Sequence, residues 1–163
     1  MPDITSDALV ERTNDHLNQY ISLADNKASI LLTAQFAFLG LSANALNNLT
    51  FQSSVVLGSA FLSGIFGIVS IFLSGWVVYP RTPTPQKGVI FWENIVAHES
   101  AEAFLEDIRG LDKGDVQEHL VRENYNLATV AHNKYRFLRW SLRGTAGMLT
   151  FAVISGGAYL LCN

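Results

Sequence analysis

The sequence predicts an all-α membrane protein with three transmembrane helices, of which the first and third continue as long helices into a small cytoplasmic helical region. Three segments (residues 28–46, 55–79 and 144–161) contain no charged residue, although charged residues make up 15% of the 163-residue chain. In addition, no Pro or Gly lies between Asp3 and Phe38, so nothing obliges the first helix to stop at a membrane surface. We expect one domain spanning residues 1–163.

The first helix is predicted to be cytoplasmic over residues 6–27 and to cross the membrane over residues 28–46. The uncharged part spans roughly 28 Å at 1.5 Å per residue, close to the thickness of a bilayer core. The charged part carries apolar residues at spacings of three, four and seven, which is typical of a seam for a partner helix. Asn14 lies on this seam and is a candidate for fixing its register. The apolar members are Val10, Leu17, Ile21, Ala24 and Ala28.

A short uncharged polar segment, residues 47–54, is predicted to form an external loop before the second span, residues 55–79. Small residues recur at four-residue intervals in this span, first as Ser59, Ser63 and Gly67 and again as Ala60 and Gly64. Such faces let helices approach closely in lipid. The face either packs against the first helix of the same chain or forms a contact between copies of the protein.

Residues 80–143 are predicted to be a cytoplasmic helical segment. The prolines at 80–85 end the second span, and the pattern then indicates one helix over 89–109 and a turn over 110–115. Asp115 is the expected N-cap of a last helix that continues into the third span, residues 144–161.

Charge gives the orientation. All eleven Lys and Arg residues lie on the side shared by the N-terminus and the middle segment, and none lies in the 47–54 loop or after residue 161. By the positive-inside rule we expect a cytoplasmic N-terminus and an external C-terminus.

A charged side chain near the inner end of a span costs free energy unless it is paired or hydrated. Counting from the outer helix ends places Asp25 level with Arg139, so we predict that these two residues pair, with Lys27 on another side of the helix. Lys134 falls on the apolar seam and is expected near Asp15 or His16. These charges either fix how the long helices meet or form a basic site for an anionic ligand.

Gln35 and Asn44 carry amide side chains inside the first span, where an unpaired polar group costs free energy. They are nine residues apart and therefore lie on roughly opposite sides of the helix. Each either makes an interhelical hydrogen bond or lines a pore that opens on activation.

No catalytic or metal-binding set stands out, and we expect no cofactor and no enzymatic activity. The segment that starts at His98 lacks the second histidine of a zinc-protease helix. Cys162 lies on the other side of the predicted membrane from the histidines, which are His16, His98, His119 and His132.

Three short motifs resemble the transmembrane effectors of bacterial cyclic-pyrimidine (Pycsar) anti-phage systems. Residues 24–28 (AlaAspAsnLysAla) resemble the motif that opens the family's first span. Residues 90–95 (IlePheTrpGluAsnIle) resemble its cytoplasmic aromatic stretch, and residues 130–135 (ValAlaHisAsnLysTyr) resemble its closing lysine motif. The resemblance implies that Asp25, Lys27 and Lys134 are motif residues.

The resemblance also implies a function. Cyclic UMP or cyclic CMP would activate the protein, which would oligomerise or rearrange, impair the bacterial inner membrane in which it lies and cause abortive infection. The partners expected are the nucleotide, the lipid bilayer and other copies of the chain, but no nucleic acid polymer. From residue type, the candidate ligand contacts are Trp92, Arg122, Tyr125, Lys134, Arg136 and Arg139. The alternatives are a non-enzymatic membrane scaffold that docks a cytoplasmic partner and, as the weakest, a small membrane enzyme.

Overall fold

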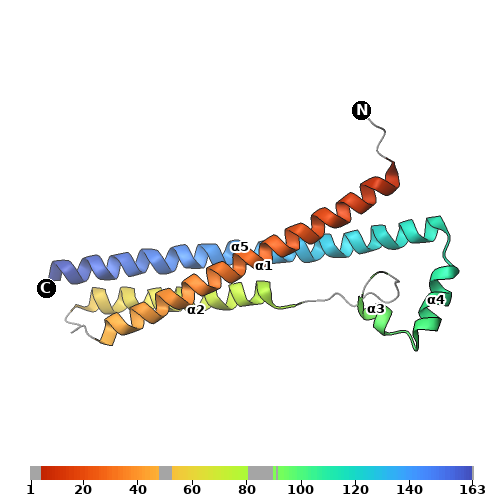
Figure 1. Ribbon diagram of the computed structural model, residues 1–163. Coiled ribbons are helices and arrows are strands. Elements are labelled where there is room, and N and C mark those ends of the chain that lie inside the picture. Colours follow the sequence, from red (N-terminus) through yellow and green to blue (C-terminus); the bar gives the residue numbers. More distant parts are fainter. Residues whose placement is uncertain (1–4, 48–52, 81–89, 91, 163) are drawn as a thin grey trace. The chain divides into compact units, whose positions relative to one another are not determined.

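The computed structural model describes residues 5–47, 53–80, 90 and 92–162, and these contain helices but no strand. Figure 1 shows the five helices in chain order: α1 Ser6–Asn47, α2 Ser54–Val78, α3 Trp92–Val96, α4 Ala101–Arg109 and α5 Lys113–Cys162. Helices α1, α2 and α5 are long and apolar enough to cross a membrane. The predicted all-α membrane fold with three spanning helices is confirmed.

Helices α1 and α5 run for 42 and 50 residues, and each passes without a break from a charged segment into an uncharged one. This continuity was predicted from the absence of Pro and Gly in the first part of α1. The uncharged segment of α5 contains four glycines and remains helical through all of them, namely Gly144, Gly147, Gly156 and Gly157. Backbone hydrogen bonding within the helix compensates for their weak helix propensity in an apolar environment.

The single helix predicted over residues 89–109 is wrong. The structure has α3 and α4 in the described part of this segment, separated by residues 97–100. Ser100 is the N-cap of α4, because its hydroxyl accepts a hydrogen bond from the backbone N–H of Ala103 at 3.1 Å. A serine that satisfies an N–H at a helix start favours a new helix over continuation of the old one.

The N-cap predicted for the last helix is displaced by three residues. Helix α5 begins at Lys113, and Asp112 accepts a hydrogen bond from the N–H of Asp115 at 2.8 Å. Asp115 in turn accepts from the N–H of Asp112 at 3.1 Å. Asp112 and Asp115 therefore form a reciprocal capping box, with Asp112 as the cap.

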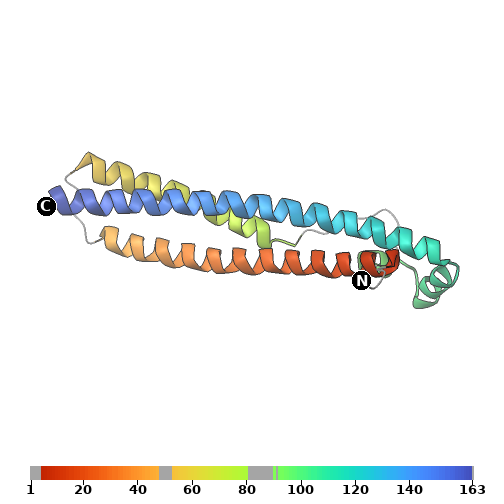
Figure 2. The ribbon, with the colours of Figure 1, turned by 90° about the horizontal axis from the view of Figure 1, so that it is seen from above.

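The chain divides into two compact units, and the division falls inside both α1 and α5. We call Ala24–Pro80 with Lys134–Asn163 the span unit, and Met1–Leu23 with Arg81–Asn133 the charged unit. Within the span unit, α2 lies beside the second parts of α1 and α5 (Figures 1 and 2). Its buried cluster consists of Ala24, Ala28, Val77 and Leu138.

The small-residue face of α2 packs inside the span unit. Ser59, Ser63, Gly67, Ser70 and Ser74 are all buried. A Cβ atom at Gly67 would lie 3.0 Å from Met148 Sδ on α5 and 3.1 Å from a methyl group of Leu39 on α1. The face therefore contacts α5 as well as the first helix. Gly64, which belongs to the other predicted small-residue pair, has nothing within 4 Å of a Cβ position.

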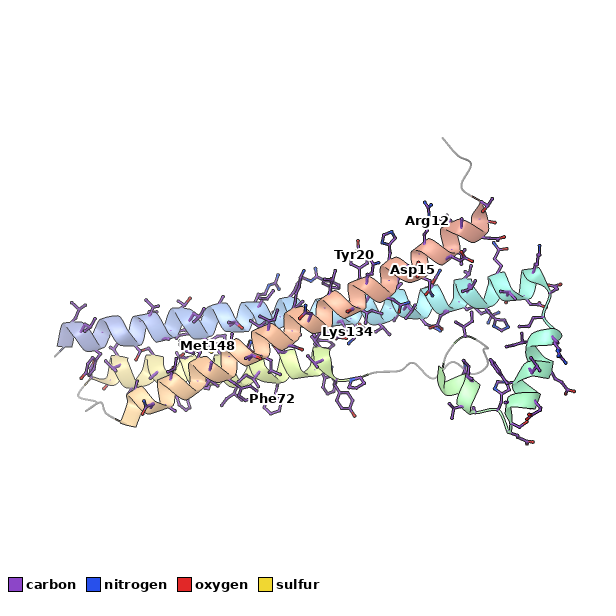
Figure 3. All side chains as sticks on the ribbon, viewed as in Figure 1. Arg12, Asp15, Tyr20, Phe72, Lys134 and Met148 are labelled. Carbon is purple, nitrogen blue, oxygen red and sulfur yellow. The ribbon has the colours of Figure 1, made fainter. Side chains whose placement is uncertain are left out.

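The outward side chains of the span unit are large and apolar, as expected of surfaces that meet lipid. Phe72 projects outward from α2, whereas Met148 on α5 is buried (Figure 3). Other exposed apolar residues of the spans are Ile30, Phe36, Leu41, Phe61 and Val153.

Candidate functional site

Lys134 joins three helices of the span unit. Its ammonium group on α5 donates hydrogen bonds to the Asp25 carboxylate on α1 and, at 2.9 Å, to the backbone carbonyl of Val77 on α2. Val77 lies in the last turn of α2, where carbonyls have no donor from their own helix and the helix dipole favours a cation. The Lys134 side chain is only 11% exposed, whereas that of Asp25 is 37% exposed. One cation therefore satisfies a carboxylate and a helix end together.

The predicted Asp25–Arg139 pair is wrong. Asp25 pairs with Lys134, while the Arg139 Nε–H donates to the carbonyl of Tyr135 in its own helix at 3.3 Å. In the span unit, hydrogen bonds between α1 and α5 join residues 106 to 110 positions apart. Counting inward from the outer helix ends placed the two helices about five residues out of register, which exceeds one turn. The same error placed Lys134 near Asp15.

A buried polar network also joins the three spanning helices, closer to the C-terminal ends of α1 and α5 than the Lys134 contacts are. The Gln35 amide nitrogen on α1 donates to Ser70 Oγ on α2 and to Thr145 Oγ1 on α5, each at 2.7 Å. Ser70 and Ser141 each donate to the other's backbone carbonyl, at 2.6 and 2.9 Å. Thr145 also donates to the Ser141 carbonyl, and Ser74 Oγ lies 2.6 Å from Ser141 Oγ. Every hydroxyl of this network can therefore place its proton on an acceptor.

The carbonyl oxygen of the Gln35 side chain has no partner within the described residues, although the residue is fully buried. Exchanging the amide nitrogen and oxygen would leave the nitrogen without a partner instead, so one end of the amide is unsatisfied in either orientation. Such a group is costly in an apolar environment. Asn44, nine residues further along α1, is exposed, in agreement with its prediction on the opposite side.

In the charged unit, α1 and α5 are joined through amides. Asn14 donates to the Asn124 side-chain oxygen at 3.0 Å, and Asn124 donates to the Val10 carbonyl at 2.9 Å. Sequence reasoning singled out Asn14 but missed Asn124. The signal was available, because Asn124 lies on the seven-residue seam of α5 that also carries the buried Ala131 and Leu138.

The residues predicted to contact a ligand are divided between the two units, and the described ones have separate surroundings. Lys134 is engaged with Asp25, and Arg122 pairs with Glu118 one turn earlier on α5. Tyr125 is exposed, and Arg136 lies with its guanidinium 5.9 Å from the Phe137 ring. Trp92 begins α3, but its side chain lies outside the described residues. Lys27 is exposed on α1.

A cavity of about 330 Å³ lies in the charged unit, between the beginnings of α1 and α5. Its charged lining residues are Asp7, Glu11, Asp112 and Lys113, so carboxylates outnumber cations. This lining disfavours a phosphate group. None of the predicted ligand contacts lines the cavity.

His98 connects α3 to α4. Its ring contacts the Asn94 carbonyl through Nδ1 at 2.7 Å and the Asp107 carboxylate through Nε2 at 3.1 Å. Partial desolvation lowers the pKa of His98, but the hydrogen bonds with Asn94 and Asp107 outweigh it and raise that pKa above its usual value. Both partners are acceptors, so only the doubly protonated imidazolium satisfies both contacts. Among the described residues, no group of three His, Cys, Asp or Glu side chains is placed to hold a metal ion.

Comparison with known proteins identifies the family. The family model of the Pycsar effector protein domain matches residues 9–161. The chain is 31% identical to the Pycsar effector protein SaPycTM of Staphylococcus aureus over 134 residues, which are 82% of this chain and 83% of the relative. No solved structure matches the chain. With its three membrane-spanning helices, the chain belongs to the Pycsar effector family and is a membrane effector of antiviral defence.

Proposed function

We propose that a cyclic pyrimidine nucleotide, cyclic UMP or cyclic CMP, activates this effector, which then rearranges or oligomerises and impairs the bacterial inner membrane. Infected cells would die or stop growing before the phage is released. The N-terminus and the middle segment would be cytoplasmic, where the nucleotide is made, and the C-terminus external.

The proposal is supported mainly by the buried polar network of the three spans. We call it the Gln35 network; it consists of Gln35, Ser70, Ser74, Ser141 and Thr145. The three spans meet through hydroxyl and amide groups as well as through apolar packing, and these groups satisfy one another while the helices are together. If the helices separate, the same groups become donors and acceptors for water, so they would line a polar path across the bilayer. The unpartnered Gln35 oxygen already favours such a hydrated arrangement.

A ligand can drive this change only if it binds the rearranged state more tightly than the packed one. Arg122 and Tyr125 lie three residues apart on α5, and both are exposed. This spacing puts them on one face of the helix, so we propose that they contact the phosphate and the base of the nucleotide. A complete site would require a second copy of the chain, because one exposed face does not enclose a nucleotide.

The experiment measures membrane potential in cells that express the chain, with cyclic UMP or cyclic CMP supplied by a co-expressed cyclase. We expect depolarisation with the active cyclase and none with a catalytically dead cyclase. Thr145→Val should change the nucleotide dose needed, because Thr145 belongs to the network. Thr150→Val is the matched control, since Thr150 is exposed and donates only to the Ala146 carbonyl of its own helix turn. An unchanged potential with both nucleotides would contradict the proposal.

A non-enzymatic scaffold is the second candidate. It is favoured by large apolar side chains that are exposed on the charged unit, namely Leu9, Val96, Val116 and Val121. Exposed apolar side chains of this kind favour contact with a protein partner over contact with water. A soluble protein that co-purifies in fixed ratio, together with an unchanged membrane potential, would support the scaffold instead of the nucleotide-activated effector.

A further inference from the structure

Three arginines lie on one exposed face of α5, directly before its uncharged segment. Arg136, Arg139 and Arg143 are spaced by three and four residues, so their side chains share one side of the helix. Trp140 lies between them and is also exposed. The Arg143 guanidinium is 4.8 Å from the centre of the Trp140 ring, close enough for a cation–π contact. We call these four residues the arginine face.

The arginine face lacks compensating carboxylates. The span unit contains one carboxylate, Asp25, and five basic residues, so its formal charge is +4. Asp25 is occupied by Lys134. Within the described residues, no ion pair involves Arg136, Arg139 or Arg143. The Arg139 Nε–H donates to the Tyr135 carbonyl, and the terminal N–H groups of all three guanidinium groups are left to bind an anion.

Aromatic side chains place this face at the boundary between water and lipid. Trp76 near the end of α2 contacts Phe137 on α5, with ring centres 6.3 Å apart, and the Arg136 guanidinium lies 5.9 Å from the same Phe137 ring. Trp76 and Trp140 are both exposed. Tryptophans that are exposed at the ends of spans mark the headgroup level of a bilayer. The arginines are therefore level with the phosphates of the lipids.

The same side of α5 continues as an apolar surface. Ile154 is 11 residues after Arg143 and 18 after Arg136, so it lies on the same side of the helix, roughly 16 Å beyond Arg143 at 1.5 Å per residue. Its side chain is exposed. An acyl chain attached to a phosphate at the arginine face could lie against this apolar side of the helix. A free anion has no acyl chain and would make no use of it.

We propose that the arginine face binds the headgroup of an anionic phospholipid in the adjacent leaflet. Guanidinium groups bind phosphate oxygens in pairs, and each basic residue near an anionic membrane surface contributes about 1 kcal/mol, or roughly fivefold in lipid preference. The proposal depends on insertion of the spans in a membrane and not on activation by a nucleotide.

The test uses the full chain with Trp140 as its reporter, after Trp76→Phe and Trp92→Phe. The protein is placed in phosphatidylcholine bilayers that contain increasing fractions of brominated phosphatidylglycerol, and the quenching of Trp140 gives the preference for the anionic lipid. We expect a preference of at least about fivefold, lost when Arg136, Arg139 and Arg143 are all changed to Gln. The matched control changes Arg12, Arg109 and Lys113 to Gln, which removes the same charge elsewhere and should leave the preference unchanged.

Equal quenching by brominated phosphatidylglycerol and brominated phosphatidylcholine would overturn the proposal. So would a preference that survives in the triple arginine variant. If cyclic UMP or cyclic CMP abolishes the preference in the unaltered arginine face, the phosphate bound there is the soluble nucleotide and not the lipid. Retention of phosphatidylglycerol by the protein in native mass spectrometry provides a second measurement if the triple variant inserts poorly.

Discussion

The two units of the molecule carry opposite charge. The charged unit holds thirteen of the fourteen carboxylates and six of the eleven Lys and Arg residues, which gives it a formal charge of −7. The span unit holds the remaining carboxylate and five basic residues, with a charge of +4. The net value of −3 for the whole chain conceals this division. An anion is therefore attracted to the span unit, whereas in the charged unit it would have to bind through local contacts such as Arg122, against the net charge.

The two units also differ in packing. Among the described residues, those that are fully buried belong to the span unit and include Gln35, Ser70, Val77, Ser141 and Met148. In the charged unit, Asn124 and Ala131 are buried to a lesser degree, and α4 buries none of its residues. The difference indicates that tight packing holds the spans, whereas the charged unit depends on a few hydrogen bonds and helix caps. We expect substitutions in the span unit to cost more.

The largest effect is expected for Lys134→Met. This change leaves the Asp25 carboxylate and the Val77 carbonyl without their cation, and breaking a buried pair by removing one partner costs about 3–5 kcal/mol. Because Asp25 is 37% exposed, we expect about 2–3 kcal/mol. The measurement is the thermal unfolding midpoint in detergent.

Two further variants sharpen this prediction. Lys27→Met removes a cation from an exposed position two residues after Asp25 and should leave the midpoint nearly unchanged. Asp25→Asn should cost less than Lys134→Met, since Lys134 keeps its bond to the Val77 carbonyl. Equal costs for Lys27→Met and Lys134→Met would show that charge alone matters at this end of the spans.

The outcome for Lys134 shows what sequence can determine. Its place on the apolar seam of α5 followed from spacing. Of the seam predicted on α1, Ala24 and Ala28 are buried, whereas its other members are half-buried. The partner of Lys134 did not follow, because helix register depends on which side chains interlock and not on where hydrophobic segments end. The break between α3 and α4 was also missed, since a single capping serine decided it. The three spanning helices were predictable because length and the absence of charge determine them.

The second largest effect is expected for Gly144→Ala. A Cβ atom there would lie 3.1 Å from Ser70 Cβ and 3.3 Å from Ser70 Oγ, so α2 and α5 would have to separate or the Gln35 network would have to shift. We expect a cost of about 1–2 kcal/mol in unfolding experiments. Gly156→Ala on the same helix is the matched control, because nothing lies within 4 Å of its Cβ position. Its better helix propensity should leave stability unchanged or slightly higher.

A smaller effect is expected in the charged unit for Asn124→Ala. It removes the bond to the Val10 carbonyl and the acceptor for Asn14, and we expect this loss to cost about 1 kcal/mol. Faster hydrogen exchange of the backbone amides at residues 10–18 would report this loss. Asn18→Ala is the control, since Asn18 is exposed and only donates to Asn14. If both variants exchange at the same rate, the amide pair does not hold these helices together.

The smallest effect is expected from the titration of His98. Its pKa is raised in the folded state, so its contribution to stability is fully present below the unfolded pKa of about 6.5 and is lost as the pH rises through the folded pKa. Above that pH the neutral ring can donate to Asn94 or to Asp107 but not to both, and residues 97–100 should exchange their amide hydrogens faster. His98→Gln should remove this pH dependence, whereas His119→Gln should keep it. A pH dependence that persists in His98→Gln would show that this histidine is not the titrating group.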